Sequence, residues 1–439
     1  MIAVYSPALT PRLRYILEFI GNELSGGPFR IFASEDEFIA AEGFKINYSH
    51  LQFSESVFTI RPVNLLFEND IKQQDLSMFD FEDTKAFFKT EGDFSFDIFA
   101  ASFYLITRYE EYLPHSLDEY GRYSHQESLA FREGFLDKPL VNIWLQSFRK
   151  SIAESDPSIH LKHQNFNCVI TYDIDIAWSY KHKGFVRTVS GFAKDLVKGQ
   201  WKALDDRWLV LRGQKQDPYD CFEWLDALHL YCRLKPHYFF LVAKKQIGYD
   251  KNISTDVKQF RELVEYYAGR YEAGIHPSWQ SGDNNKLLKE ELEWLEVIAD
   301  KPVQSSRQHY IRFKTPDTFR NLIERGIVNE YSMGYGTING FRASVCSSYK
   351  WFDILKNEAT ELHMHPYCFM DANSFFEQHQ TPGQTYQELL GYYERVKKVN
   401  GTMISIWHNH MLGTDPKFAG WPQMFELFMR ETVYWDAYS

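Results

Sequence analysis

The chain has 439 residues, of which 44% are apolar and 17% are aromatic, enough for two or three domains with large cores. Its formal net charge is -11, with 59 acidic residues against 48 basic ones, which argues against nucleic acid or an anionic membrane as the main partner. The five cysteines are scattered without a CxxC pair, which argues against a disulfide framework or a structural zinc site and favours a reducing compartment.

The amino terminus lacks the pattern of a secretory signal. The stretch MIAVYSPALTPRLRYIL has no basic start followed by an apolar run and a small-residue cleavage site. No stretch of the sequence approaches the roughly 18 apolar residues that a membrane span needs. We therefore expect a cytoplasmic protein without a membrane span.

Residues 1–160 are predicted to form a smaller α/β domain whose role the sequence does not indicate. IAVYS and FRIFAS have the composition of strands, and residues 10–24 that of a helix, with Thr10 as its N-cap and Pro11 at its first position. Two further helices are expected in SFDIFAASFYLITRYEEYL and PLVNIWLQSFRKSIAES. The polar stretch 154–166 is the best candidate for a domain boundary.

Residues 161–439 show a different pattern, in which short apolar strands alternate with helices. This alternation is typical of βα units and of a largely parallel sheet or barrel. The expected strands are CVITYDID, HYFFLVA, YEAGIHPS, VQSSRQHY, EYSMGY, GFRAS, ELHMHPY and TMISIWHN. Residues 182–220 interrupt the alternation, and we expect an insertion that packs over the barrel mouth or, alternatively, a lid that shapes a substrate cleft.

The first of these strands carries two aspartates, Asp173 and Asp175. Because strand side chains alternate between faces, both carboxylates point to the same side, about 7 Å apart along the chain. Two buried like charges this close repel each other unless a cation or a basic partner is present. A divalent cation would compensate them, with one aspartate as a ligand and the other as a base.

Other strands also end in residues that carry chemistry. In barrel-like α/β folds the carboxyl ends of parallel strands meet at one mouth, so these side chains are expected to converge there. Imidazole and carboxylate together suit zinc, and a hydrolytic zinc site keeps one position open for water and substrate. The strand-end residues are Asp173, Asp175, His276, His309, Arg342, His363, His365, His408 and His410.

In this order and spacing, the motifs resemble the metal-dependent polysaccharide deacetylases, the group that includes chitin and peptidoglycan deacetylases. TYDID is similar to the first motif of that family, HYFFLV to the strand that follows it, EAGIHPSW to the strand with the first metal histidine, GFRAS to the Arg-x-Pro motif, and ISIWHN to the closing strand. The resemblance covers roughly residues 165–439. The part before it resembles an extra α/β domain that precedes such a deacetylase in some bacterial proteins of unassigned role.

The resemblance implies a distorted (β/α) barrel and a metal-dependent hydrolase that removes an acyl group, N-acetyl above all, from a sugar or glycan. The implied cofactor is a divalent metal, with zinc the first choice. Carried over residue by residue, Asp173 would be the general base, while Asp175 and His276 would be metal ligands. Arg342 would hold Asp173 in position, and His408 would protonate the leaving amine.

One position departs from the family pattern. The family's second motif supplies another histidine four residues after the first, and here that position is Gln280. We expect His309 to replace it as the third ligand; the alternatives are a contact to a metal ligand or to the substrate, and a role in packing alone. The histidines at 363 and 365 belong either to the mouth or to the barrel rim. Asp371 is either a rim acid that contacts sugar hydroxyls or a turn residue.

Two other functions compete with the hydrolase. A non-catalytic carbohydrate-binding or assembly protein on a degenerate deacetylase barrel is favoured by Gln280, but a binder needs neither the base Asp173 nor the acid His408. A glycosidase is the weaker alternative, because no second strand-end carboxylate stands out as a partner for Asp173. A cytoplasmic deacetylase would need a nucleotide-linked or lipid-linked sugar precursor as its substrate.

Overall fold

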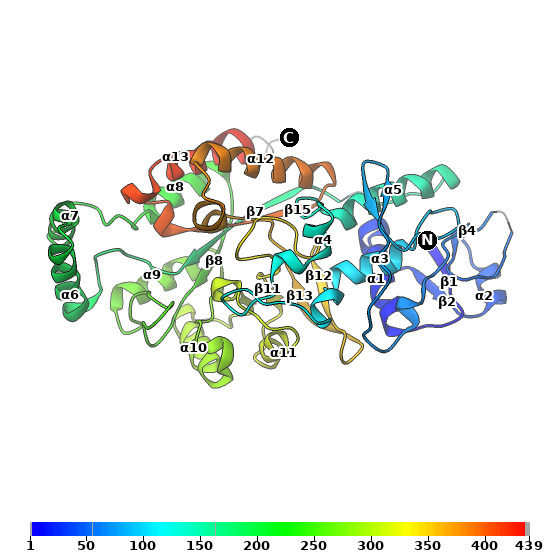
Figure 1. Ribbon diagram of the computed structural model, residues 1–439, viewed down its shortest axis with the longest axis horizontal. Helices are drawn as coiled ribbons and strands as arrows, with labels where there is room; N and C mark the ends of the chain where they lie inside the picture. The colour runs from blue at the N-terminus through cyan, green and yellow to red at the C-terminus, as the bar shows by residue number, and fades with distance from the viewer. Residues whose placement is uncertain (1, 55, 163, 435–439) are drawn as a thin grey trace.

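The computed structural model describes residues 2–54, 56–162 and 164–434. Figure 1 shows an elongated molecule with a small sheet at one end, a large sheet in the middle, and a pair of helices projecting from the other end. In the described part of the chain, no helix is both long enough and apolar enough to cross a membrane.

The small sheet belongs to the first 60 residues and is parallel, with the strand order β2-β1-β3-β4. The predicted helix over residues 10–24 is confirmed as α1, in which Thr10 Oγ1 accepts a hydrogen bond from Leu13 N and Pro11 is the first residue. A separate antiparallel pair, β5–β6, follows. The elements of this part are β1 (Ile2–Tyr5), α1 (Pro11–Ser25), β2 (Arg30–Phe32), α2 (Glu35–Ala40), β3 (Phe44–Asn47), β4 (Phe58–Thr59), β5 (Phe79–Phe81), β6 (Thr84–Ala86), α3 (Ile98–Ile106), α4 (Leu129–Arg132) and α5 (Leu140–Ser155).

The large sheet has the order β12-β13-β11-β10-β9-β8-β7-β15-β14, and its neighbours are parallel except for the β12–β13 pair. Parallel strands put their carboxyl ends at one edge, which is what assembles the site described below. The strands are β7 (Asn167–Ile174), β8 (His237–Phe240), β9 (Glu272–Ile275), β10 (Ser305–Ser306), β11 (Asn329–Glu330), β12 (Tyr349–Asp353), β13 (Glu358–Met364), β14 (Phe369–Met370) and β15 (Thr402–His408).

The expected barrel is an open sheet, since its hydrogen-bonded order begins at β12 and ends at β14. The segment 358–370 nevertheless links the two sides, because β13 pairs with β11 and β14, four residues later, pairs with β15. The predicted strand GFRAS is wrong: residues 340–344 form a bend and a turn, with Ser344 at φ 52°. The strands β12 and β14 were not predicted, because neither follows a helix and the alternation of strands and helices does not indicate them.

Helices flank the large sheet, and two more form a hairpin between β7 and β8. The hairpin helices α6 and α7 pack against each other and project from the end of the molecule opposite the small sheet (Figure 1). The expectation that this insertion packs over the mouth is therefore not met. The helices of this part are α6 (Gly184–Val197), α7 (Trp201–Leu211), α8 (Phe222–Cys232), α9 (Lys258–Ala268), α10 (Asn285–Ala299), α11 (Asp317–Glu324), α12 (Pro382–Lys398) and α13 (Trp421–Phe428).

The two sheets share one continuous hydrophobic core. The α1 side chain Tyr15 lies against Phe352 of β12, with ring centroids 4.9 Å apart, and its hydroxyl donates to Lys350 O at 2.7 Å. Burying these rings removes large apolar areas from water, so the two parts stabilise each other.

A buried ion-pair network also joins the two parts, and it corrects one expectation. Arg342 was expected to hold Asp173 in position. Instead it forms a bidentate ion pair with Glu111, with 2.8 Å between Nε and Oε1 and 2.7 Å between Nη2 and Oε2. Arg108 pairs with the same carboxylate at 2.7 Å. Burial alone would raise the pKa of Glu111, but the two guanidinium groups lower it to about 2. Arg342 is thus a structural residue, placed by a turn where a strand was expected.

Replacing Arg342 with methionine should therefore destabilise the fold and leave the chemistry intact. Removing one partner of a buried ion pair commonly costs about 3–5 kcal/mol, and we expect the lower end because Arg108 still faces Glu111. Urea unfolding measures the change. The control is Arg430→Met on an exposed pair with Glu426, for which we expect a loss of about 0.5 kcal/mol or less. A variant that is stable but inactive would return Arg342 to the catalytic machinery.

Candidate active site

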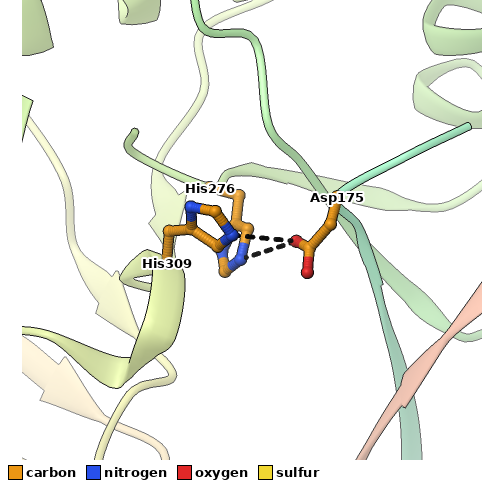
Figure 2. A group of neighbouring side chains, drawn as sticks. All are labelled: Asp175, His276 and His309. Atoms are coloured by element: carbon orange, nitrogen blue, oxygen red, sulfur yellow. Dashed lines mark ion pairs between the residues drawn. The ribbon is translucent and has the colours of Figure 1, made fainter. Parts of the chain in front are cut away.

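The carboxyl edge of the large sheet brings together the residues that the sequence singled out. Asp175, His276 and His309 offer ligand atoms that all lie within 4.8 Å of one another. The His276 Nε2 atom is 3.1 Å from Asp175 Oδ1, and His309 Nε2 is 3.7 Å from the same oxygen. Figure 2 shows both imidazole rings turned toward the carboxylate.

The far side of each ring fixes where its proton sits. The Nδ1 atom of His276 is 2.5 Å from Arg307 O, and Nδ1 of His309 is 3.0 Å from a carboxylate oxygen of Asp250. A carbonyl and a carboxylate only accept hydrogen bonds, so each Nδ1 carries a proton and donates it. In the neutral ring this leaves the Nε2 lone pair, and both Nε2 atoms point at Asp175.

These three groups fit a metal ion. Two imidazole lone pairs and a carboxylate oxygen converge, and Asp175 Oδ1 is buried without a partner in hydrogen-bond geometry. Such an arrangement is costly unless a cation or a proton lies among the three atoms. Two histidines and one carboxylate are a common zinc set, and the backing acceptors on Nδ1 are typical of metal-bound histidines. Without a metal ion, a protonated His309 would compensate the carboxylate instead: burial would raise the pKa of Asp175, but the charge of His309 and hydrogen bonds from His276 and His309 bring it well below its usual range.

Gln280, the position where the resemblance calls for a histidine, has a definite place in this arrangement. Its side-chain Nε2 donates to Asp250 Oδ2 at 3.1 Å, while the other oxygen of Asp250 faces His309. Trp279 N also donates to Asp250 at 2.9 Å. Gln280 therefore holds the Asp250 carboxylate, which in turn orients His309. It reaches the candidate metal position only through these two residues and does not face it directly. No sequence pattern pointed to Asp250, which lies in the loop after β8.

Asp250→Asn should weaken metal binding without abolishing it. An asparagine amide donor facing Nδ1 would favour the wrong ring tautomer of His309, and loss of such a backing group typically costs 10- to 100-fold in metal affinity. Competition with a zinc chelator measures the affinity. Glu291→Gln is the control, since its buried carboxylate accepts from Ser278 N on the loop after β9 that also carries Gln280. Equal affinities in the two variants would argue against the role of Asp250.

Asp173 lies beside this cluster and has its own buried partner. Arg307 is fully buried and its Nη1 donates to Asp173 Oδ1 at 2.8 Å and to Thr171 Oγ1 at 2.7 Å. Arg307 thus fills the role that the resemblance gave to Arg342. One signal could have found it: Arg307 lies two residues before His309, so strand alternation puts both on the same side. The second oxygen, Asp173 Oδ2, is 3.8 Å from His276 Nε2 and is the one left to face a substrate.

His408 is the last residue of β15 and faces Asp175 Oδ2, whereas His276 and His309 face the other oxygen, Oδ1. Its Nε2 is 3.6 Å from Asp175 Oδ2, and its Nδ1 is 2.6 Å from Asp371 Oδ1. Burial lowers the pKa of His408, but the Asp371 carboxylate outweighs burial and raises it to about 10. Asp371 is fully buried and also accepts from His408 N at 2.8 Å. It is therefore neither the rim acid nor the turn residue expected, and it orients a histidine.

The pocket at this edge has a volume of about 340 Å³ and is lined by Asp173, Asp175, His276, His309 and His408. Its aromatic wall contains Tyr249 and Tyr310, whose ring centroids are 4.8 Å apart, and Tyr120, which lies 5.5 Å from Tyr310. Tyr120 and Arg122 come from the N-terminal part of the chain, and Arg122 Nη1 donates to Tyr310 O at 2.6 Å. The first 160 residues thus contribute directly to the pocket, which no sequence pattern indicated.

The remaining strand-end histidines divide between two places. His410 lines the pocket, and burial together with His408 lowers its pKa to about 3. His365 is stacked on Tyr331 at 4.4 Å and lies 3.0 Å from Asn329 Oδ1, away from the pocket lining. His363 lines a separate small cavity beside α1. The last two therefore belong to the packing of β13 and not to the mouth.

Comparisons with known proteins agree with a deacetylase-like fold only in part. Residues 2–157 match a family of unknown function (DUF7033). None of the curated proteins compared matches the chain. Similar solved structures include the polysaccharide deacetylase Bc1974 from Bacillus cereus, at 11% identity and TM-score 0.30, covering 60% of this chain and 87% of that one.

Two further solved structures resemble the chain to a similar degree. A protein from Mycobacterium smegmatis described as a polysaccharide deacetylase has 12% identity and TM-score 0.40, covering 62% of this chain and 85% of that one. PuuE allantoinase has 10% identity and TM-score 0.37, covering 61% and 83%. All these TM-scores lie below 0.5, so the likeness is partial and concerns the arrangement of the fold alone.

Proposed function

We propose that the protein is a metal-dependent hydrolase that removes an acyl group, N-acetyl above all, from a sugar or glycan. The observation that carries the proposal is the convergence of two Nε2 lone pairs on a buried carboxylate oxygen, flanked by an aspartate on one side and a histidine on the other. Asp175, His276 and His309 would hold the metal, with zinc the best match to this donor set. When bound, zinc supplies a Lewis acid for an acyl carbonyl and lowers the pKa of water.

The residues beside the metal position divide the proton transfers between them. Asp173 Oδ1 is bound by Arg307, so Oδ2 takes the proton of the attacking water. His408 carries its proton on Nε2, facing the pocket, because Nδ1 is committed to Asp371, and it donates that proton to the departing nitrogen. Each such acid–base step is commonly worth about 10²–10⁴ in rate.

The pocket wall supports a sugar as the substrate. Tyr120, Tyr249 and Tyr310 present a cluster of rings beside the catalytic groups, and each hydroxyl-bearing ring combines an apolar face with a polar edge. A sugar ring offers the matching combination of C–H faces and hydroxyl groups. Arg122, buried except for its access to the pocket, adds a donor that suits a hydroxyl or a carbonyl oxygen.

The alternative is a non-catalytic carbohydrate-binding protein, and metal exchange separates the two. The purified protein is stripped with a chelator and reloaded with zinc, and the release of acetate from short N-acetylated oligosaccharides is measured. We expect turnover to disappear on stripping and to return on reloading. A protein that binds the oligosaccharides in both states but releases no acetate in either is the binder. A protein that holds no zinc at all contradicts the metal site itself.

A further inference from the structure

The α6–α7 hairpin, residues 181–215, has no part in the proposed chemistry and is built differently from the rest of the chain. Its two helices run antiparallel around a turn at Gly199, which has φ 65°. A single ion pair, Arg207 Nη2 to Asp195 Oδ2 at 2.7 Å, lies between the helices, with Tyr180 4.6 Å below the guanidinium group. Among the residues of α6 and α7, all of which the structure describes, only three are buried: Asp195, Arg207 and Val210.

Large apolar side chains on this hairpin are left in solvent. Phe185 is 84% exposed, Val197 is 86% exposed and Trp201 is 68% exposed. Single exposed apolar residues are ordinary, but so many on two adjacent helices mark an interaction surface. The exposed apolar residues are Phe185, Val186, Val189, Leu196 and Val197 on α6, and Trp201, Trp208 and Leu211 on α7.

The spacing of these residues puts both apolar stripes on one side of the hairpin. At 3.6 residues per turn, Phe185, Val189 and Leu196 share a face of α6, and Trp201, Trp208 and Leu211 share a face of α7. On α6 the residue that contacts the other helix is Asp195, and on α7 it is Arg207. Counted around each helix axis in the direction of the chain, the apolar face lies about a quarter to a third of a turn beyond that contact residue. Because the helices are antiparallel, rotations in the same sense bring both faces to the same side.

The hairpin is also basic, although the protein is acidic. Residues 181–215 contain nine Lys and Arg residues against three Asp residues, so the segment has a formal charge of +6, while the whole chain has -11 and the rest therefore carries -17. Lys194, Lys198 and Lys202 are exposed around the turn, and Arg187 and Lys194 share the face of α6 opposite its apolar stripe. An apolar side and a basic polar side are the two properties of a helix that lies in the surface of an anionic bilayer.

We propose that the α6–α7 hairpin binds the surface of a membrane rich in anionic phospholipid. The apolar side would enter the boundary between headgroups and acyl chains, and the lysines would remain among the phosphate groups. A second copy of the chain fits this surface less well, since an isologous contact would bring two +6 hairpins together. The sequence as a whole argued against an anionic membrane as a partner, and the separation of charge into one projecting hairpin removes that objection.

The base of the hairpin is tied to the rim of the active-site pocket. Arg187 donates to Asn252 O and to Lys251 O, both at 3.0 Å, and Lys251 lines the pocket. The strand that leads into the hairpin is β7, which carries Asp173. The membrane proposal itself stands without the proposed hydrolase activity.

Vesicle sedimentation of the full-length protein tests this proposal. We expect binding to vesicles of phosphatidylcholine mixed with phosphatidylglycerol in equal parts, little binding to phosphatidylcholine alone, and a decrease as salt is added. The double variant Trp201→Ser, Trp208→Ser and the triple variant Lys194→Glu, Lys198→Glu, Lys202→Glu should each weaken binding at least about tenfold. Both change only exposed residues, so far-ultraviolet circular dichroism and the unfolding transition should match the wild type.

Matched controls place the same changes elsewhere on the surface. Leu230→Ser with Val297→Ser removes two apolar residues that are 81% and 77% exposed, and Lys235→Glu, Lys286→Glu, Lys289→Glu reverses three exposed lysines. These variants should bind vesicles like the wild type. Wild-type protein that stays in the supernatant, or hairpin variants that sediment as well as the wild type, would overturn the proposal. So would a dimer in solution that dissociates in the Trp201→Ser, Trp208→Ser variant.

Discussion

Asp173→Asn should lower the turnover of N-acetylated oligosaccharides by about 10²–10⁴ and leave the zinc content unchanged. The asparagine has the same shape and can still accept a hydrogen bond from Arg307, so the neighbourhood of Asp175 and His276 stays in place. It cannot take a proton from water at neutral pH. The measurement is the initial rate of acetate release at saturating substrate, with zinc determined on the same sample.

The control for this variant is Asp353→Asn. Asp353 is also buried and also pairs with an arginine, at 2.7 Å from Arg320 Nε, but it lies on β12 outside the pocket lining. We expect the control to lose stability and keep its turnover per folded molecule. Wild-type turnover in Asp173→Asn would remove the general base, and a loss of zinc would make Asp173 part of the metal site instead.

The protonation state of His408, the proposed general acid, depends on its contact with Asp371. The protonated form of His408 is the proton donor, and the Asp371 carboxylate keeps its pKa raised to about 10. The donor is therefore protonated throughout the neutral range and is lost only as pH rises through that pKa.

The sequence predicted the parts of the fold and site that rest on periodicity and strand ends. Four of the site residues, Asp173, Asp175, His276 and His408, come at or just after the ends of β7, β9 and β15. These strands lie within four consecutive strands of the parallel sheet, β9-β8-β7-β15, so topology alone brings the residues to one edge. His309 follows the short strand β10 and reaches the same edge. In each case the local pattern and the parallel sheet agree.

The sequence failed where a contact depends on distant segments. The partner of Arg342 is Glu111, 231 residues away, and nothing in GFRAS reveals that a turn faces the N-terminal part. Asp250 and Tyr120 lie in loops whose composition resembles many others, so their place at the pocket follows only from tertiary packing. The resemblance implied that an arginine holds Asp173 but did not identify it correctly, because Arg307, directly after β10, meets the same electrostatic need.

His309→Ala should remove bound zinc and, with it, nearly all turnover, because only Asp175 and His276 would remain as ligands. Zinc content after dialysis and acetate release measure the two losses. His365→Ala is the control: it deletes a half-buried imidazole that stacks on Tyr331 outside the pocket, so it should reduce stability while keeping zinc. The space left by the missing ring should admit free imidazole, and millimolar imidazole should restore part of the zinc binding in His309→Ala but not in Asp175→Ala. If His309→Ala retains its full zinc content, a different group is the third ligand in place of the histidine that the family has at position 280. The contacts among Gln280, Asp250 and His309 would then serve packing alone.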